Sequence, residues 1–133
     1  MTRELTFTKL KNLLKFSYVP YSKFPVSCIV TMKNGEEIAG VNVENASFPA
    51  GICAERSALP QVFALGFKKE DIVSISIMTS SKGFGSPCGI CRQFISEMVD
   101  DSVKIEIFNI NKHLGDYVIG DFLPFKFSSE ELK

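Results

Sequence analysis

Three cysteines and a glutamate stand at spacings that suit a metal site with an adjacent acid. Cys53 and Glu55 lie two residues apart in "GICAERSALP", and Cys88 and Cys91 form a C-x-x-C in "SPCGICRQF". Three thiolates suit Zn²⁺, which prefers tetrahedral sulfur and nitrogen ligands. A C-x-x-C that opens a helix after a strand is also typical of a redox pair. The redox interpretation leaves Cys53 and Glu55 without a role.

Helix geometry places such a metal at the tip of a helix. Successive helical residues turn by about 100°, so Cys53 and Glu55 lie about 200° apart and can share a site only around the first turn. Cys88 and Cys91, at positions i and i+3, are neighbours on one helix face. Two helix N-termini would then point at the metal, and their positive dipole ends favour the thiolate form that binds zinc.

The number of protein ligands distinguishes a catalytic zinc from a structural one. A structural zinc takes four protein ligands, whereas a catalytic zinc keeps its fourth position for water. The candidates for a fourth ligand are Cys28, expected to be a core thiol on a strand, and His113, expected in a solvated polar turn. Three ligands then remain beside Glu55, whose carboxylate can move a proton from a bound water to a leaving group.

Arg56 and Arg92 each directly follow a candidate ligand or catalytic residue. Three thiolates overbalance the charge of Zn²⁺ and weaken its ability to acidify water. Charge-assisted hydrogen bonds from a guanidinium to the sulfurs would offset this excess. For Arg56 we favour this role over a surface salt bridge, and for Arg92 both interpretations stay open.

The elements that position these residues are predicted to alternate between strands and helices. Helical patterns cover 5–17, 53–65 (ending at Gly66) and 88–99, with a one-turn helix near 128–132. Strand patterns cover 26–32, 36–44, 71–80, 102–110 and 117–119, the first two joined by a turn at Asn34-Gly35. A hairpin followed by strand-helix-strand units implies a mixed sheet with helices on its faces.

The composition fits a single domain spanning residues 1–133. Lys plus Arg equals Asp plus Glu at 15 each, and a neutral chain without a basic run argues against a nucleic-acid surface. The N-terminal "MTRELTFTKLKNLLKF" is charged and amphipathic rather than a signal peptide, and no apolar run approaches the roughly 20 residues of a membrane span. We therefore expect a cytoplasmic protein, in which thiols stay reduced.

The "CAE" and "PCGICRQ" motifs resemble those of the zinc nucleoside deaminases. Cysteine as the first ligand is similar to the small cytidine deaminases that assemble as homotetramers. The resemblance extends through "YSKFPV", "GVNVENASFPAGICAERSA" and "DFLPFKFSSEEL", and so covers nearly the whole chain. It implies an α/β fold, a three-layer α-β-α sandwich around a mixed sheet of about five strands. It also implies one Zn²⁺ per chain, a nucleoside substrate and a homotetramer. From the charge and the apolar runs we expect neither nucleic acid nor membrane as partner.

The resemblance assigns roles to individual residues. It makes Cys53, Cys88 and Cys91 the zinc ligands and Glu55 the general acid and base. The residues that it places against the nucleoside are Phe24, packed on the pyrimidine, Asn42 and Glu44, on the ribose 3′-hydroxyl, and the backbones of Ala54 and Ser86, on the base. The sequence alone also fits another role for Asn42 and Glu44, because an amide and a carboxylate two apart can cap a turn.

Three positions, and the tail segment "DFLP" in place of the usual "ELLP", depart from the family pattern. Phe48 stands where many relatives have a tyrosine that reaches a neighbouring subunit's site, and Ile90 replaces a common small residue between the two cysteines. Phe127 falls near a late aromatic that closes an adjacent site in the family. Pro60 lies inside the expected helix 53–65 and predicts a kink, or a helix that ends early and restarts.

The favoured hypothesis is a cytidine and deoxycytidine deaminase of pyrimidine salvage. One alternative is a deaminase of a cytosine-nucleoside antibiotic of the blasticidin-S type, which shares C-A-E and P-C-G-x-C; the intact "NVEN" favours a true ribose. Another is a non-catalytic structural-zinc module, in which Cys28 or His113 completes a closed site. Editing of nucleic acid is disfavoured by the neutral charge and by cysteine as first ligand.

Overall fold

The computed structural model describes residues 2–132 and is built on one five-stranded sheet in the order β2-β1-β3-β4-β5. β3 and β4 are parallel, and the other neighbouring strands are antiparallel. The predicted mixed α/β sheet is therefore confirmed. The strands are β1 (Val26–Met32), β2 (Glu37–Val41), β3 (Ile72–Thr79), β4 (Lys104–Phe108) and β5 (His113–Tyr117).

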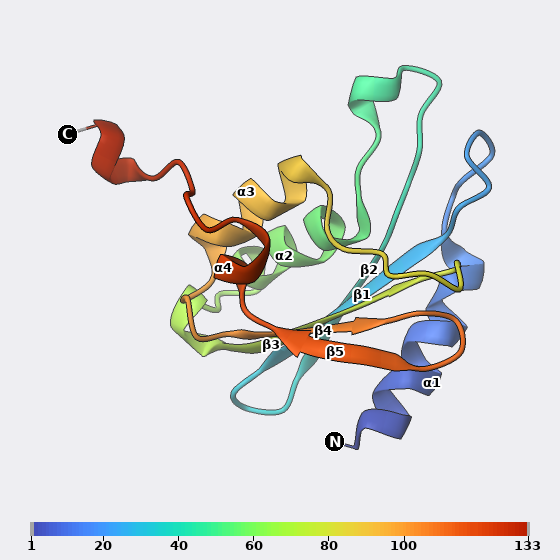
Figure 1. The fold of residues 1–133 in the computed structure, drawn as a ribbon, viewed down its shortest axis with the longest axis horizontal. Helices are drawn as coiled ribbons and strands as arrows, with labels where there is room; N and C mark the ends of the chain where they lie inside the picture. Colours follow the sequence, from blue (N-terminus) through green and yellow to red (C-terminus); the bar gives the residue numbers. More distant parts are fainter. Residues whose placement is uncertain (1, 133) are drawn as a thin grey trace.

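Helices cover both faces of this sheet, as Figure 1 shows. Successive residues of a strand point to opposite faces. Cys28 packs in the core shared with α2 and α3, whereas Ile29 packs in a second core under Leu10 of α1. The helices are α1 (Arg3–Leu13), α2 (Ala54–Ala64), α3 (Gly89–Met98) and α4 (Ile119–Phe122), with 3₁₀ turns at Leu14–Phe16, Phe48–Ala50, Lys69–Asp71 and Ser129–Leu132.

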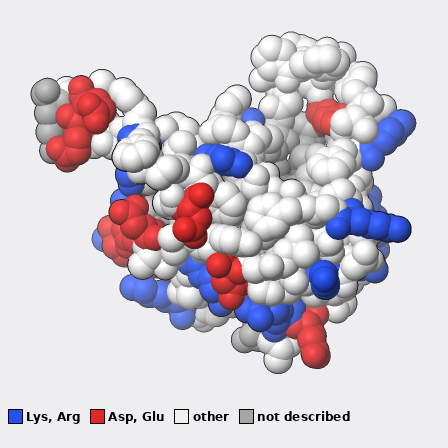
Figure 2. Space-filling view, viewed as in Figure 1, with Lys and Arg blue, Asp and Glu red and all other residues white. Residues whose placement is uncertain are grey.

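Two segments extend away from the layered body (Figure 1). One carries the 3₁₀ turn Phe48–Ala50, between β2 and α2, and the other is the C-terminal tail beyond α4. In the same view, Figure 2 shows charges of both signs interspersed over the body, while the part that protrudes at the top of the picture carries few charged side chains. No helix in residues 2–132 is long and apolar enough to cross a membrane.

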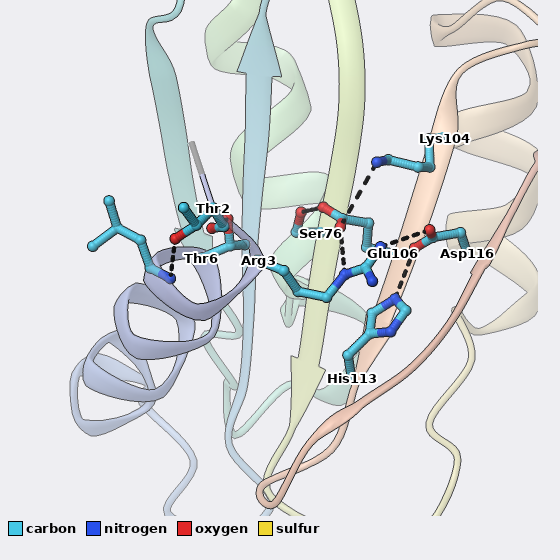
Figure 3. A network of polar contacts seen from close by, with 9 residues as sticks. Thr2, Arg3, Thr6, Ser76, Lys104, Glu106, His113 and Asp116 are labelled. Carbon is cyan, nitrogen blue, oxygen red and sulfur yellow. Dashed lines mark hydrogen bonds and ion pairs between the residues drawn. The ribbon is translucent and has the colours of Figure 1, made fainter.

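Helix α1 is fixed to the sheet by a polar network at its N-terminus (Figure 3). Arg3 forms ion pairs with Glu106 on β4, at 3.7 Å, and with Asp116 on β5, at 2.8 Å. Ser76 of β3 donates a 2.7 Å hydrogen bond to Glu106, and His113 pairs with Asp116 at 2.7 Å. These partners compensate the burial of Glu106, which is 8% exposed.

The prediction of a strand at 117–119 is wrong. The strand is β5, His113–Tyr117, and residues 119–122 form α4. Among the described residues β5 pairs only with β4, at the edge of the sheet. Its residues are therefore at most partly buried, and its sequence shows no apolar alternation. His113 accordingly lies in a strand rather than a solvated turn, with its ring 5.2 Å from the ring of Phe108.

Of the two outcomes predicted at Pro60, a helix that ends early and restarts is also wrong, whereas a kink stays a prediction. α2 runs unbroken from Ala54 to Ala64, and Pro60 is exposed on its surface. Its end is as predicted, because Gly66 has a left-handed φ of +90°. The amides of Gly66 and Phe67 then bond the carbonyls of Phe63 and Val62, each at 3.0 Å, which satisfies the last turn.

Candidate active site

Three thiols meet where two helices begin. Cys53 is the N-cap residue of α2, Cys88 is the N-cap residue of α3, and Cys91 follows in the first turn of α3. Their sulfurs lie within 4.8 Å of one another, with Cys53 Sγ and Cys88 Sγ 3.7 Å apart. Tetrahedral zinc with bonds of about 2.3 Å separates its sulfur ligands by about 3.8 Å. The three cysteines are therefore positioned to hold a zinc ion.

The surroundings of Cys53 favour its thiolate. A hydrogen bond from the Cys91 thiol lowers the pKa of Cys53 to about 5, and Arg56 contributes through its Nη2, 3.8 Å from the sulfur. The same bond to Cys53, together with burial, raises the pKa of Cys91. Because the thiolate is the form that binds metal, the lowered pKa of Cys53 suits a metal ligand. The hydrogen bond from Arg56 to Cys53 Sγ is the contact that the sequence predicts for this arginine.

Glu55 is a buried acid in the first turn of α2, with 4% of its surface exposed. Burial raises its pKa, and the nearby Cys53 sulfur adds to the effect. A carboxyl group whose pKa is raised toward neutrality is better matched to taking and giving protons at physiological pH.

A cavity of about 450 Å³ opens beside the sulfurs. Cys53, Glu55 and Cys88 line it. The residues expected to contact a nucleoside line the same cavity: Phe24, Asn42, Glu44, Ala54 and Ser86. The structure thus brings the expected metal ligands, acid and binding residues to one place.

The side chains of Asn42 and Glu44 also hold the chain segment that carries Phe24. Asn42 Oδ1 accepts a 2.9 Å hydrogen bond from the amide of Val26, and its Nδ2 donates at 2.9 Å to the carbonyl of Phe24. Glu44 accepts hydrogen bonds from segment 21–22 on the same side of the cavity. The two residues therefore cap a turn and line the cavity at once.

Arg92 does not contact the sulfurs. Its guanidinium donates to the Pro87 carbonyl at 2.7 Å, to Ser86 Oγ at 2.8 Å and to the Phe122 carbonyl at 3.0 Å. Within residues 2–132 none of its hydrogen bonds reaches a thiol, so the interpretation that it neutralises the sulfurs is wrong. It fixes the backbone directly before Cys88 instead, through carbonyl groups that sequence motifs do not reveal.

Neither candidate for a fourth ligand belongs to the described sulfur cluster. Cys28 is fully buried in the core, and burial raises the pKa of its thiol. His113 packs on the α1 face of the sheet, against Phe108, whereas the cysteines lie at the starts of α2 and α3. The donor set of the described residues is thus three thiolates, which leaves the fourth position that a catalytic zinc gives to water.

A second group of ligand atoms lies under α1. Atoms of Glu106, His113 and Asp116 approach within 4.8 Å of one another. However, Arg3 and Lys104 form ion pairs with these carboxylates, as Figure 3 shows. Cationic side chains therefore already balance this group, and its contacts fix α1 to the sheet.

Comparison with known proteins defines the class of this site. Residues 1–107 match the family model described as the cytidine and deoxycytidylate deaminase zinc-binding region. The chain belongs to this family.

Individual relatives align over almost the whole chain. It is 33% identical to a cytidine deaminase of Halalkalibacterium halodurans over 132 residues, which cover 99% of this chain and 98% of that one. It is 36% identical to a cytidine deaminase of Mycoplasma pneumoniae over 124 residues, 92% of each chain. The crystal structure of cytidine deaminase from Burkholderia pseudomallei superposes with a TM-score of 0.90 at 31% identity, covering 96% of this chain and 100% of that one. The expected deaminase fold is therefore confirmed.

Proposed function

We propose that this chain deaminates cytidine and 2′-deoxycytidine hydrolytically, in pyrimidine salvage. The products are uridine or 2′-deoxyuridine and ammonia. One observation carries the proposal: a single cavity is lined by two of the clustered cysteines, by the buried acid Glu55 and by the polar side chains of Asn42 and Glu44. Membership of the deaminase family supports the same reaction.

In this mechanism Glu55 moves the protons. The chemistry that a bound zinc supplies is a water acidic enough to act as a nucleophile near neutral pH. Cys53, Cys88 and Cys91 would hold the zinc. Glu55 would take a proton from the attacking water, whose oxygen bonds to C4 of the pyrimidine, and would give that proton to N3. Glu55 would then carry the remaining proton of the new C4 hydroxyl to the amine, so that the C4–N bond breaks, ammonia departs and C4 keeps a carbonyl. The raised pKa of Glu55 suits both transfers.

The remaining residues hold the nucleoside. Phe24 packs on the pyrimidine, while the Ala54 amide and the Ser86 carbonyl bond its polar edge. Asn42 and Glu44 bind the sugar hydroxyl. Arg56 stabilises the cluster through its contact with Cys53 Sγ.

The decisive experiment is conversion of cytidine by the purified, zinc-loaded chain, followed by ultraviolet absorbance, with metal content measured in parallel. We expect about one zinc per chain. Glu55→Gln should keep the metal and lose at least about 100-fold in kcat, the effect of a general acid and base. Glu97→Gln, on the exposed surface of α3, is the matched control and should behave as the wild type. Turnover by Glu55→Gln equal to that of the control would refute the assignment.

A competition assay separates true nucleosides from nucleoside antibiotics. The hydrogen bonds that place Asn42 and Glu44 on the cavity wall favour a substrate with a sugar hydroxyl. We expect cytidine to be converted at least about tenfold faster than blasticidin S at equal concentration. The reverse order would assign the chain to antibiotic deamination.

We further propose that four chains assemble, in a reducing cytoplasm. Large apolar side chains are exposed near the starts of α2 and α3, among them Phe48 at 76% and Ile90 at 66%. A cavity of about 590 Å³ between these helices is lined by Ile52, Pro60 and Ile90. Light scattering should give the mass of a tetramer. Ile90→Glu should lower it, whereas Leu5→Glu, on α1, should not.

A further inference from the structure

Ser22 connects the two sides of the proposed nucleoside site. It lies on the segment between α1 and β1 and lines the cavity together with Phe24 and Glu44. Its hydroxyl donates a hydrogen bond to Glu44 Oε2 and accepts one, at 3.1 Å, from the backbone amide of Phe24. A single hydroxyl therefore connects the carboxylate to the backbone of the aromatic residue.

The hydrogen bonds of Glu44 leave little capacity for anything else. Its Oε1 accepts the backbone amides of Tyr21 and Ser22, both at 3.1 Å, and its Oε2 accepts the Ser22 hydroxyl. A carboxylate offers about four acceptor positions, so about one remains, on Oε2. The Ser22 hydroxyl is also the main reason why the pKa of Glu44 lies below its usual value. The oxygen that can still accept a sugar hydroxyl is thus the one that Ser22 orients.

Asn42 completes this arrangement. One of its two amide N–H groups and one of its two acceptor positions are used by Phe24 and Val26. It therefore keeps one N–H to donate, beside a carboxylate that keeps one position to accept. Backbone bonds from Tyr18 to Asn42, at 3.0 Å, and from Glu44 to Tyr18, at 2.8 Å, join the two segments. The parts that would touch the sugar and the base thus form one connected unit.

The turn that presents Phe24 depends on such bonds. Lys23 has a φ of +57°, a left-handed conformation that is unfavourable for a residue with a Cβ atom. The bond from the Phe24 amide to Ser22 Oγ spans this residue. An unfavourable conformation persists only where surrounding contacts determine it, so loss of the Ser22 hydroxyl should loosen the turn.

We propose that Ser22 is a positioning residue, whose hydroxyl aligns Glu44 with the sugar hydroxyl and fixes Phe24 against the base. Recognition of the sugar is thereby coupled to placement of the reacting ring. The inference rests on the proposed deamination of a nucleoside and adds a residue that contacts substrate only through its neighbours.

The test compares Ser22→Ala with a matched serine. Ser47→Ala is the control, because Ser47 lies exposed three residues after Glu44 and its hydroxyl bonds no residue in the described range. With cytidine, Ser22→Ala should lower kcat/KM about 10- to 100-fold, the effect of a hydrogen bond to a charged group. Ser22→Thr keeps the hydroxyl at an exposed position and should stay within about threefold of the wild type.

A double-mutant cycle separates positioning from a general structural effect. Glu44→Ala removes the acceptor of the Ser22 hydroxyl, so in that background Ser22→Ala should cost only about threefold or less. Amide hydrogen exchange gives a readout that does not depend on activity. In the zinc-loaded protein the Phe24 amide should exchange at least about tenfold faster in Ser22→Ala than in the wild type. In Ser47→Ala its exchange rate should equal that of the wild type.

The outcomes distinguish this inference from the proposed function. If the wild type converts cytidine but Ser22→Ala matches Ser47→Ala, or the cycle is additive, the inference is overturned and the function stands. If the wild type does not convert cytidine, the proposed function fails. The exchange rate of the Phe24 amide then still tests whether Ser22 stabilises the turn. An equal rate in Ser22→Ala and the wild type would overturn this role of Ser22 as well.

Discussion

Replacing Gly40 by alanine tests how closely α2 must approach the sheet to form the metal site. Gly40 lies on β2 below the start of α2. A Cβ atom at this position would lie 2.5 Å from the carbonyl oxygen of Ala54 and 2.7 Å from the amide nitrogen of Ala58. Ordinary contacts begin near 3.4 Å, so the backbone of α2 must move by about 0.7–0.9 Å.

The expected cost follows from this displacement. Overpacking of a dense core destabilises by about 1–3 kcal/mol. Unfolding entropy of about 2.1 cal/mol/K per residue gives about 0.28 kcal/mol/K for 133 residues. Gly40→Ala should therefore lower Tm by about 4–11 °C. Since α2 carries Cys53 and Glu55, a shift of about 1 Å should also lower kcat/KM by up to about 100-fold.

Thermal unfolding and steady-state kinetics of the zinc-loaded protein measure both effects. Gly120→Ala is the matched control, because a Cβ atom there meets nothing within 4 Å. If Gly40→Ala keeps the Tm and kcat/KM of this control, α2 does not require the close approach. Such a result would refute the need for glycine beneath the site.

Three further substitutions test the surroundings of the site. Arg92→Ala frees the backbone before Cys88 and should weaken zinc binding at least about tenfold in a competitive chelator titration. Cys28→Ala should keep about one zinc per chain by metal analysis, since Cys28 lies outside the cluster. Burial opposes ionisation of Asp116, but His113 and Arg3 outweigh it and lower its pKa. Asp116→Asn should therefore lower the free energy of urea unfolding at pH 7, and this difference should disappear as pH falls through the lowered pKa.

Local spacing predicts the metal site well because the site lies at helix ends. The separation of Cys53 from Glu55 by two residues, and the i, i+3 relation of Cys88 to Cys91, are properties of the first turn of a helix. The observed N-caps at Cys53 and Cys88 agree with that geometry. Each helix start could therefore be predicted from its own few residues.

Contacts between distant segments could not be predicted in this way. Arg92 bonds the carbonyl of Phe122, 30 residues away, and Glu44 bonds Ser22, 22 residues away. No local period indicates such pairs, because tertiary packing brings the backbone groups together. The strand at His113 escaped prediction for a related reason, since an edge strand with one paired neighbour need not alternate apolar and polar residues.

These distant contacts explain how the side chains of Asn42 and Glu44 can both stabilise the wall of the cavity and remain able to bind a ligand. Asn42 uses about half, and Glu44 about three quarters, of its hydrogen-bonding capacity on segment 21–26, which fixes their orientation before any ligand arrives. The few positions left over are then held in place, so a sugar hydroxyl need not order them on binding. The same bonds fix the backbone of Phe24, and the proposed base and sugar contacts become one rigid surface. In the proposed site, Ser22 would therefore control through Glu44 and Phe24 how well both parts of the nucleoside are held.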